Sequence, residues 1–349
     1  MFYLLSLRVA RAGGGGLTGM LALACWFFSS AVAASENYGD HPRARALIEE
    51  LATEHNFDSA DLTRIFGQAQ KKQAILDAIA RPAEKTKPWK DYRAIFLTPS
   101  RIDKGVQFWR DNRAVLERAH DSYGVPPEIV VAIIGVETRY GRNTGSYRVI
   151  DALSTLAFDY PKRSPFFTRE LKHFLLLTRE QQQDPLALKG SYAGAMGYGQ
   201  FMPSSYRAYA VDFDNDKFVD IWSNTTDAIG SVANYFKRHG WQSDAAVVAR
   251  ARISGDYDRE PVNQSLKPTH TVQQLAQLGF SSTVEHDPEQ PATIMKLQGE
   301  HGAEFWIGLK NFYVITRYNR SRLYAMAVYQ LSEAIRVKAQ TEKVAAIIE

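Results

Sequence analysis

The chain is poor in cysteine and has no dense block of one charge. Cys25 is the only cysteine among 349 residues, so no disulfide framework can form and stability must come from a buried core. The formal net charge is +4. Lysine and arginine are interspersed with acidic residues, which argues against nucleic acid as a partner. No internal repeat is present, and the chain is long enough to bury a large core and to divide into subdomains.

Residues 1–33 have the features of a secretory signal peptide. Arg8 and Arg11 provide the positive start, and an apolar run over 17–28 follows. Ala31-Val32-Ala33 then matches the small-x-small pattern that precedes a cleavage site. The apolar run is too short for a membrane span. The sequence therefore predicts an exported protein.

Cys25 allows a second interpretation of this segment. Leu21-Ala22-Leu23-Ala24-Cys25 loosely resembles a lipoprotein signal, which is cleaved before a cysteine that then carries lipid. The residue three positions before Cys25 is alanine rather than leucine, and apolar residues continue beyond it. These departures favour ordinary cleavage, with a lipid anchor at Cys25 as the alternative.

The spacing of apolar and breaker residues predicts a mainly helical chain with one β-containing interval. Helical spacing is found over 41–66, where Asp58 and Asp61 are expected to cap a second helix that runs through Ile65. Further helices are expected over 73–79, 100–123, from Pro127 through Glu137, and over 150–156, 165–183, 226–240 and 320–339. Strands are expected over 247–253, 293–297 and 304–308.

The most informative segment is the apolar run from Val130 to Val136, which leads directly into Glu137. Burial disfavours the charged form of a carboxylate, so the pKa of Glu137 should be raised and the group could hold a proton near neutral pH. A general acid has this property. The alternative is a solvated glutamate at a helix end, paired with Arg139.

A second segment, 191–206, is rich in glycine and aromatic residues. Gly194, Gly197 and Gly199 would allow the backbone to approach a ligand closely. Gln200 offers an amide donor and acceptor. The alternative is a tight connection between helices, packed with aromatic side chains.

A third segment carries carboxylates at the spacing of an EF-hand calcium loop. Positions 1, 3, 5 and 9 of such a loop would be Asp212, Asp214, Asp216 and Asp220, with the carbonyl of Phe218 at position 7. Lys217 replaces the usual glycine of position 6, and Ser223 replaces the glutamate of position 12. Lys217 would have to adopt a left-handed conformation, or its ammonium would neutralise the cluster without metal. A solvated acidic turn is the alternative to a calcium site.

Together these segments resemble the lytic murein transglycosylase B family (glycoside hydrolase family 103). The resemblance rests on Gly135-Val-Glu-Thr-Arg-Tyr-Gly141 and, about sixty residues later, on Ala195-Met-Gly-Tyr-Gly-Gln-Phe-Met-Pro-Ser-Ser-Tyr206. Motifs at 101–109, 228–236 and 312–319 extend it over most of the mature chain.

This resemblance implies a mainly α fold, with a lysozyme-like helical core, an additional helical region and a small β-containing subdomain. The implied boundaries are a signal peptide at 1–33, an N-terminal helical region at 34–99, a catalytic core at 100–245 with the EF-hand-like loop at 212–227, the β-containing subdomain at 246–310, and a C-terminal cleft segment and helix at 311–349. The protein is expected to be a periplasmic monomer that acts on peptidoglycan glycan strands.

The resemblance also implies a mechanism with one carboxylate. Glu137 would protonate the oxygen between N-acetylmuramic acid and N-acetylglucosamine and then accept the proton of the C6 hydroxyl, which closes a 1,6-anhydro ring. Asp151 and Asp159 follow in the chain, but no matched motif makes either a second catalytic acid.

The family pattern places further residues around the substrate and the metal. Ser191, Gln200, Tyr318 and Asn319 would line the cleft, and Tyr192, Met196, Tyr198 and Phe201 would shape the sugar subsites. Calcium would be held by Asp212, Asp214, Asp216, Phe218 and a closing Asp227, for stability only, because the chemistry needs no cofactor.

Two other functions are open on the sequence. A lysozyme-type hydrolase would cleave the same bond with water, and its products would be heavier by one water. A non-catalytic peptidoglycan-binding scaffold would not need a desolvated acid, so Glu137 argues against it.

Overall fold

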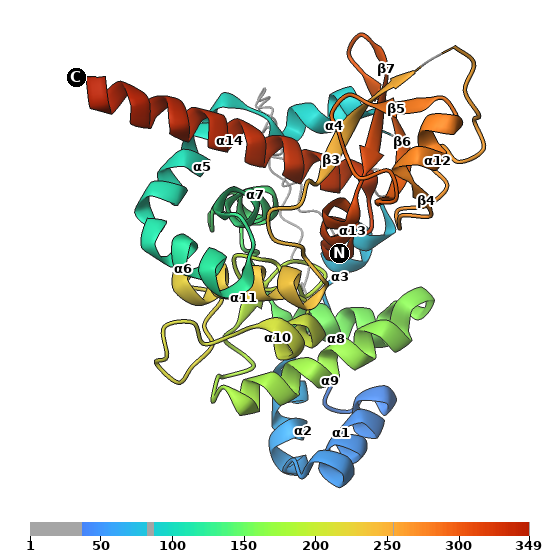
Figure 1. Ribbon diagram of the computed structural model, residues 1–349. Helices are drawn as coiled ribbons and strands as arrows, with labels where there is room; N and C mark the ends of the chain where they lie inside the picture. The colour runs from blue at the N-terminus through green and yellow to red at the C-terminus, as the bar shows by residue number, and fades with distance from the viewer. Residues whose placement is uncertain (1–36, 82–86, 254, 349) are drawn as a thin grey trace, which may run out of the picture.

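The computed structural model describes residues 37–81, 87–253 and 255–348 (Figure 1). The predicted signal peptide, with Cys25, lies outside these residues. Before the central helix α7 (Pro127–Thr138) come α1 (Pro42–His55), α2 (Ser59–Gln68), α3 (Gln73–Ala80), α4 (Trp89–Phe96), α5 (Pro99–Asp111) and α6 (Arg113–Tyr123). After it come α8 (Val149–Asp159), the short η1 (Pro161–Arg163), α9 (Ser164–Glu180), α10 (Pro203–Tyr209), α11 (Thr225–Arg238), α12 (Val272–Gln277), α13 (Lys310–Tyr318) and α14 (Arg322–Ile348). In this part of the chain we find no helix of the length and apolarity that a membrane crossing requires.

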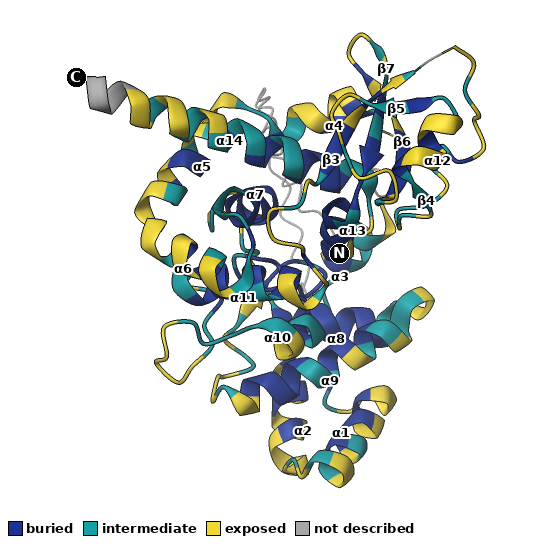
Figure 2. Cartoon of the chain, in the orientation of Figure 1, coloured by how far each residue is buried: buried dark blue, intermediate teal, exposed yellow. Residues whose placement is uncertain are grey.

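Helix α7 is almost entirely buried (Figure 2). Pro127 occupies its first turn, where a missing backbone N–H does no harm. Every residue from Ile129 to Thr138 is buried, so the helix is apolar all round, as a core helix must be. It packs against α5, α6, α11 and α14. The backbone then turns into a left-handed conformation at Arg139 (φ 52°) and ends the helix.

The helix predicted over 100–123 is in fact two helices, α5 and α6, which meet at Asn112. The backbone of Asn112 leaves the helical region (φ −116°, ψ 22°), and its side-chain amide donates to the carbonyl oxygen of Phe108 at 2.9 Å. Asparagine side chains compete with helical backbone bonds in this way. The break turns the chain around α7, so that two faces of this helix are covered by one stretch of sequence (Figure 1).

The β-containing subdomain is an antiparallel sheet of five strands in the order β4-β6-β7-β3-β5. Its strands are β3 (Val248–Ile253), β4 (His270–Thr271), β5 (Phe280–Ser282), β6 (Pro291–Gly299) and β7 (Gly302–Gly308), and a separate pair joins β1 (Tyr147–Arg148) to β2 (Lys189–Gly190). The predicted architecture, a helical body with a small β-containing subdomain, is confirmed.

Each face of the five-stranded sheet is partly buried. Met295 and Leu297 of β6 belong to the main core, while their neighbour Ile294 packs on the other face with Leu275 of α12. Alternate residues of a strand point to opposite faces, so a single strand fixes the subdomain to the helical body and builds the subdomain's own core.

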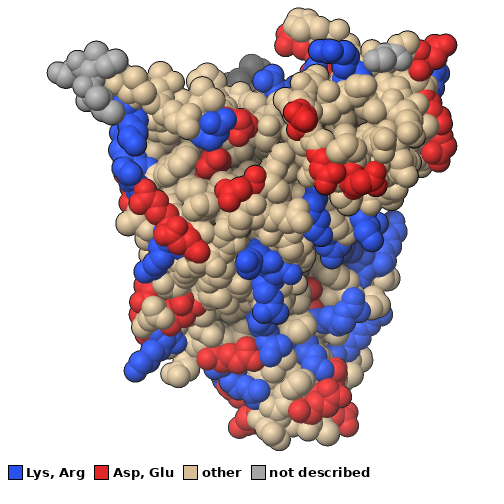
Figure 3. Space-filling model, viewed as in Figure 1, with Lys and Arg blue, Asp and Glu red and all other residues tan. Residues whose placement is uncertain are grey.

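Lysine and arginine side chains are interspersed with acidic ones on the face shown in Figure 3.

Candidate active site

Glu137 lies in the last turn of α7 and is 9% exposed. The hydroxyl of Tyr324, near the start of α14, donates a hydrogen bond to Oε1 of Glu137 at 2.7 Å. Burial raises the pKa of Glu137 to about 8, and the hydrogen bond from Tyr324 opposes part of that rise. A carboxyl group with this pKa is mostly protonated at neutral pH, so it can act as an acid.

Tyr324 is the one side chain that hydrogen-bonds Glu137 among the described residues. Arg139, considered above as an ion-pair partner, makes no contact of this kind with Glu137. The two aspartates that follow have structural partners instead. Asp151 accepts from the guanidinium of Arg148 and from the backbone of Gln70, and Asp159 accepts from Tyr38. Among the described residues, no second carboxylate hydrogen-bonds Glu137, although glycosidases usually use a pair.

Thr138 connects the end of α7 to the glycine-rich segment. Its hydroxyl donates to the carbonyl oxygen of Tyr198 at 3.0 Å and accepts from the backbone of Gly141, also at 3.0 Å. The ring of Tyr198 covers Gly141, where a β-carbon would lie 2.3 Å from a ring atom. These contacts hold residues 191–201 beside Glu137.

The glycines of this segment make room for protein atoms. A β-carbon on Gly194 would meet Leu153 at 2.4 Å, one on Gly197 would meet the carbonyl oxygen of Ile221 at 2.3 Å, and one on Gly199 would meet the hydroxyl of Tyr318 at 2.8 Å. Gly194 and Gly197 also have positive φ angles of 81° and 66°. The packing interpretation of these glycines therefore describes the structure better than close approach to a ligand.

The substrate-binding residues predicted from the family pattern fall into two groups. Tyr192, Tyr198 and Asn319 are partly exposed. The others are buried, and they are Ser191, Met196, Gln200, Phe201 and Tyr318. Ser191 accepts the backbone N–H of Ala195 at 3.0 Å.

Tyr318 joins α13 to the glycine-rich segment. Its hydroxyl donates to the carbonyl of Gly199 at 2.5 Å, and its ring contacts that of Phe201. Burial, followed by the charge of Glu137, raises the pKa of Tyr318 well above its ordinary value. The phenol thus stays neutral and continues to donate its hydrogen bond.

Tyr324 was missed by the sequence analysis. It lies within the helix predicted over 320–339, but nothing in its local pattern separates it from a core tyrosine. Its role depends on a partner 187 residues earlier in the chain. A pairing of that separation has no signal in a single sequence.

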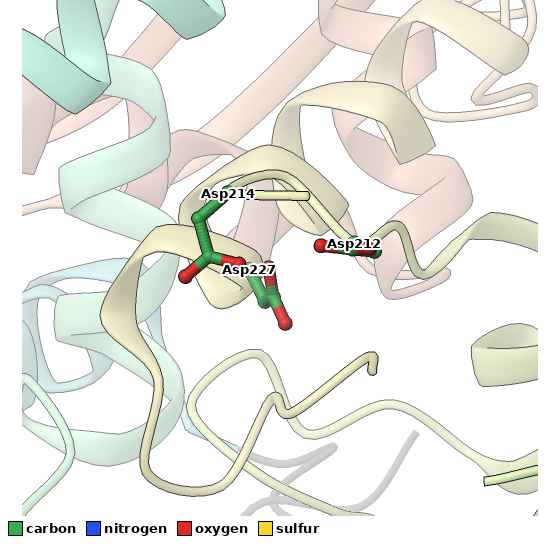
Figure 4. A group of neighbouring side chains, drawn as sticks. All are labelled: Asp212, Asp214 and Asp227. Carbon is green, nitrogen blue, oxygen red and sulfur yellow. The ribbon is translucent and has the colours of Figure 1, made fainter. Parts of the chain in front are cut away.

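The carboxylates of the acidic loop approach one another in the structure. Oxygens of Asp212, Asp214 and Asp227 all lie within 4.8 Å of one another (Figure 4). Lys217 has the left-handed conformation that its position requires (φ 80°). Asp216 stands outside this group, and its Oδ1 accepts the backbone N–H of Phe218 at 2.8 Å.

Asp227 is the buried member of the acidic group. Burial raises its pKa, backbone N–H groups of Phe213 and Asp220 oppose the rise, and the charges of Asp214 and Asp212 add to it. Like charges gathered around a buried carboxylate favour binding of a cation or a proton. The two hydrogen bonds, at 2.7 and 2.8 Å, hold both Asp227 oxygens in place.

Comparisons with known proteins agree on one family. A family model described as a transglycosylase SLT domain matches residues 39–333. The chain is 45% identical over 310 residues to the membrane-bound lytic murein transglycosylase B of Escherichia coli (strain K12), across 86% of this chain and 84% of that protein. A soluble lytic transglycosylase of Pseudomonas aeruginosa has 54% identity and a TM-score of 0.82, across 85% of this chain and 99% of that one. A lytic transglycosylase of Escherichia coli in complex with calcium has 42% identity and a TM-score of 0.79, across 88% and 98% of the two chains.

Proposed function

We propose, since the chain belongs to the lytic murein transglycosylase B family, that Glu137 is both the acid and the base of its reaction. The protein is a peptidoglycan lytic transglycosylase. The observation that supports the role of Glu137 is a buried carboxyl group whose pKa is raised to about 8 and which has no second carboxylate beside it among the described residues.

The proposed reaction has two proton transfers. Protonated Glu137 donates its proton to the oxygen between N-acetylmuramic acid and N-acetylglucosamine, and the bond from that oxygen to the anomeric carbon breaks. The N-acetyl oxygen of the substrate stabilises the positive charge on this carbon. Glu137 then accepts the proton of the C6 hydroxyl, whose oxygen bonds to the anomeric carbon. The 1,6-anhydro ring closes, Glu137 regains its proton, and no water is consumed.

The environment of Glu137 suits both steps. A raised pKa keeps the proton available for the first step at neutral pH, and it makes the carboxylate a stronger base in the second. The hydroxyl of Tyr324 is aimed at one oxygen of Glu137, which leaves the other oxygen for the substrate. We assign Tyr324 the role of a positioning residue.

For the glycan, the partly exposed Tyr192, Tyr198 and Asn319 are proposed to touch the sugars directly. The buried residues of the predicted set, Ser191, Met196, Phe201 and Tyr318, would shape the cleft from behind. Gln200 is a special case, because its buried Oε1 has no hydrogen-bond partner in the described part of the chain and would accept a hydrogen bond from the substrate.

We further propose a structural calcium site in the acidic loop. Calcium–oxygen distances are about 2.3–2.6 Å, so one ion can reach oxygens that lie within about 5 Å of one another, as those of Asp212, Asp214 and Asp227 do. Asp216 and the carbonyl of Phe218 would complete the site after a local adjustment. The relative of known structure in complex with calcium supports this assignment.

The cellular location of the protein and the division of its chain are also proposed. The membrane-bound relative is consistent with the periplasm or the outer membrane, so we propose an exported protein, with Cys25 as an alternative lipid anchor. We propose that the protein is a monomer with an N-terminal helical region at 34–99, a catalytic core at 100–245, a β-containing subdomain at 246–310 and a C-terminal segment at 311–349.

The decisive experiment is mass spectrometry of the fragments released from purified murein. The proposed reaction gives 1,6-anhydro products, whereas a hydrolase would give products heavier by one water. The variant Glu137→Gln should lose activity by about a hundredfold to ten-thousandfold, because glutamine has nearly the same shape but cannot supply the proton. A folded variant with normal activity would exclude Glu137 from the mechanism.

A further inference from the structure

A small pocket lies beside the end of the catalytic helix and is separate from the residues assigned so far. It lies between the α4–α5 turn and the first residues after α7, and its volume is about 190 Å³. Pockets that enclose drug-sized ligands have about 300 Å³ or more. This pocket is therefore sized for one chemical group rather than for a disaccharide.

The charge of this pocket is uniform. Arg101, Lys104 and Arg139 line it, and no acidic residue does. The side chains of Lys104 and Arg139 form no hydrogen bond or ion pair with any residue that the structure describes. Like charges held together repel one another, and an anion placed among them would relieve that repulsion.

Hydrogen-bond donors surround the same space. The hydroxyl of Ser100 lies at the start of the thirteen-residue helix α5, whose N-terminus carries partial positive charge. Tyr140 joins the two walls, because its hydroxyl donates to the carbonyl oxygen of Arg101 at 2.8 Å. A cavity walled by two cations without partners, a third cation and a hydroxyl has the chemistry of a carboxylate-binding site.

The position of Arg139 relates this pocket to the scissile bond. Arg139 follows Glu137 by two residues, so their Cα atoms are at most about 7 Å apart. The left-handed backbone of Arg139 (φ 52°) ends α7 and directs the chain away from the helix axis. The pocket therefore lies next to the end of the helix that carries Glu137, within the reach of a group attached to the muramic acid residue.

We propose that this pocket binds a carboxylate of the peptide carried by the muramic acid residue. The proposal rests on the proposed function, because it names the part of the peptidoglycan that the pocket recognises. Murein sugars are neutral apart from their peptides, whose glutamyl and C-terminal carboxylates are the anions nearest the glycan. The pocket would thereby favour strands that still bear peptides.

The test compares two substrates, glycan strands with their native peptides and the same strands with the peptide carboxylates amidated, because removing the peptides with an amidase would leave a new carboxylate on each muramic acid. The variants Lys104→Gln and Arg139→Gln remove one positive charge each, and Lys237→Gln, an exposed lysine of α11, is the matched control. We expect the ratio of kcat/KM for native strands to kcat/KM for amidated strands to fall about tenfold in both pocket variants, since each loses a hydrogen bond to a charged group. The ratio should stay at the wild-type value in the control.

A second measurement uses Glu137→Gln, which binds but should not cleave. Calorimetry should detect binding of a free stem tetrapeptide, and should detect much weaker binding when its carboxylates are amidated or when Lys104→Gln is added. An unchanged ratio in the kinetic test, equal slowing on both substrates, or equal binding of the amidated peptide would overturn the proposal. Wild-type products heavier by one water, in place of the 1,6-anhydro products, would instead contradict the proposed function. The two failures are therefore distinguishable.

Discussion

Gln200 combines a strained backbone with a side chain that is only half satisfied. Its φ angle is 51°, in the left-handed region. Its Nε2 donates to the carbonyl oxygens of Thr144 and Gly197, both at 3.0 Å. These bonds fix the orientation of the amide, so Oε1 is the atom left for a ligand. Gln200 therefore serves packing through its two donated hydrogen bonds and keeps one acceptor for binding.

We expect Gln200→Glu to be destabilising. A carboxylate oxygen would replace Nε2 and face two carbonyl oxygens at the same distance, with no hydrogen to share. The loss should be about 1–3 kcal/mol, measured by denaturant unfolding. Gln273→Glu on the exposed face of α12 is the matched control. Equal stability of Gln200→Glu and the wild type would show that the amide orientation is not fixed by these carbonyls.

Residues of the site differ in how far the sequence predicts them. Glu137 was predictable because its cause is local, an apolar run that ends in one carboxylate. The role of Gly194, Gly197 and Gly199 was not, because the atoms they make room for come from distant segments. The role of Tyr324 could not be predicted for the same reason, because its partner Glu137 lies 187 residues earlier in the chain.

At the scale of elements, long strands and amphipathic helices were predictable, and short strands were not. The expected strands correspond to β3, β6 and β7. β4 has two residues and pairs with β6, and β5 has three residues and pairs with β3. Strands this short are too brief to show the alternation of apolar and polar residues that marks a strand in a sequence. The break at Asn112 was missed because the apolar spacing continues across it.

The acidic loop, together with the start of α11, gives the element-scale prediction. Bound calcium should raise stability, because the unfolded chain has no such site; at a hundred times the Kd the gain is about 2.7 kcal/mol. A chelator should therefore lower the Tm, and calcium should restore it better than magnesium. Asp227→Asn should lose this response.

The control for the calcium experiment is Asp121→Asn, an exposed aspartate of α6. It should respond to chelator and calcium as the wild type does. Identical melting of the wild-type protein in chelator and in millimolar calcium would mean that the loop is an acidic turn.

At the scale of the whole molecule, the buried acid makes stability depend on pH. The pKa of Glu137 is about 8 in the folded protein and near 4.5 when unfolded. Between these values the folded state holds a proton that the unfolded state has lost, so the free energy of unfolding should fall as pH rises. The slope is at most about 1.4 kcal/mol per pH unit.

Glu137→Gln should remove this component. Its free energy of unfolding should exceed that of the wild type by a margin that grows from pH 5 to pH 8, measured by denaturant unfolding at each pH. Other titrating groups, such as His173 and His239, are present in both proteins and cancel in the difference. Parallel curves of the free energy of unfolding against pH for the two proteins would contradict a raised pKa of Glu137.

The hydrogen bond between Tyr324 and Glu137 has a further consequence for how the enzyme is made. It spans 187 residues, and the bond from Tyr318 to Gly199 spans 119. Contacts of such separation form late in folding, because long loops must close first. The proposed catalytic acid therefore gains its hydrogen-bond partner only when helix α14 has docked. A chain that stops before Tyr324 carries Glu137 but lacks the tyrosine proposed to position it, so we expect the ability to cut the cell wall only after α14 has been synthesised and has packed on α7.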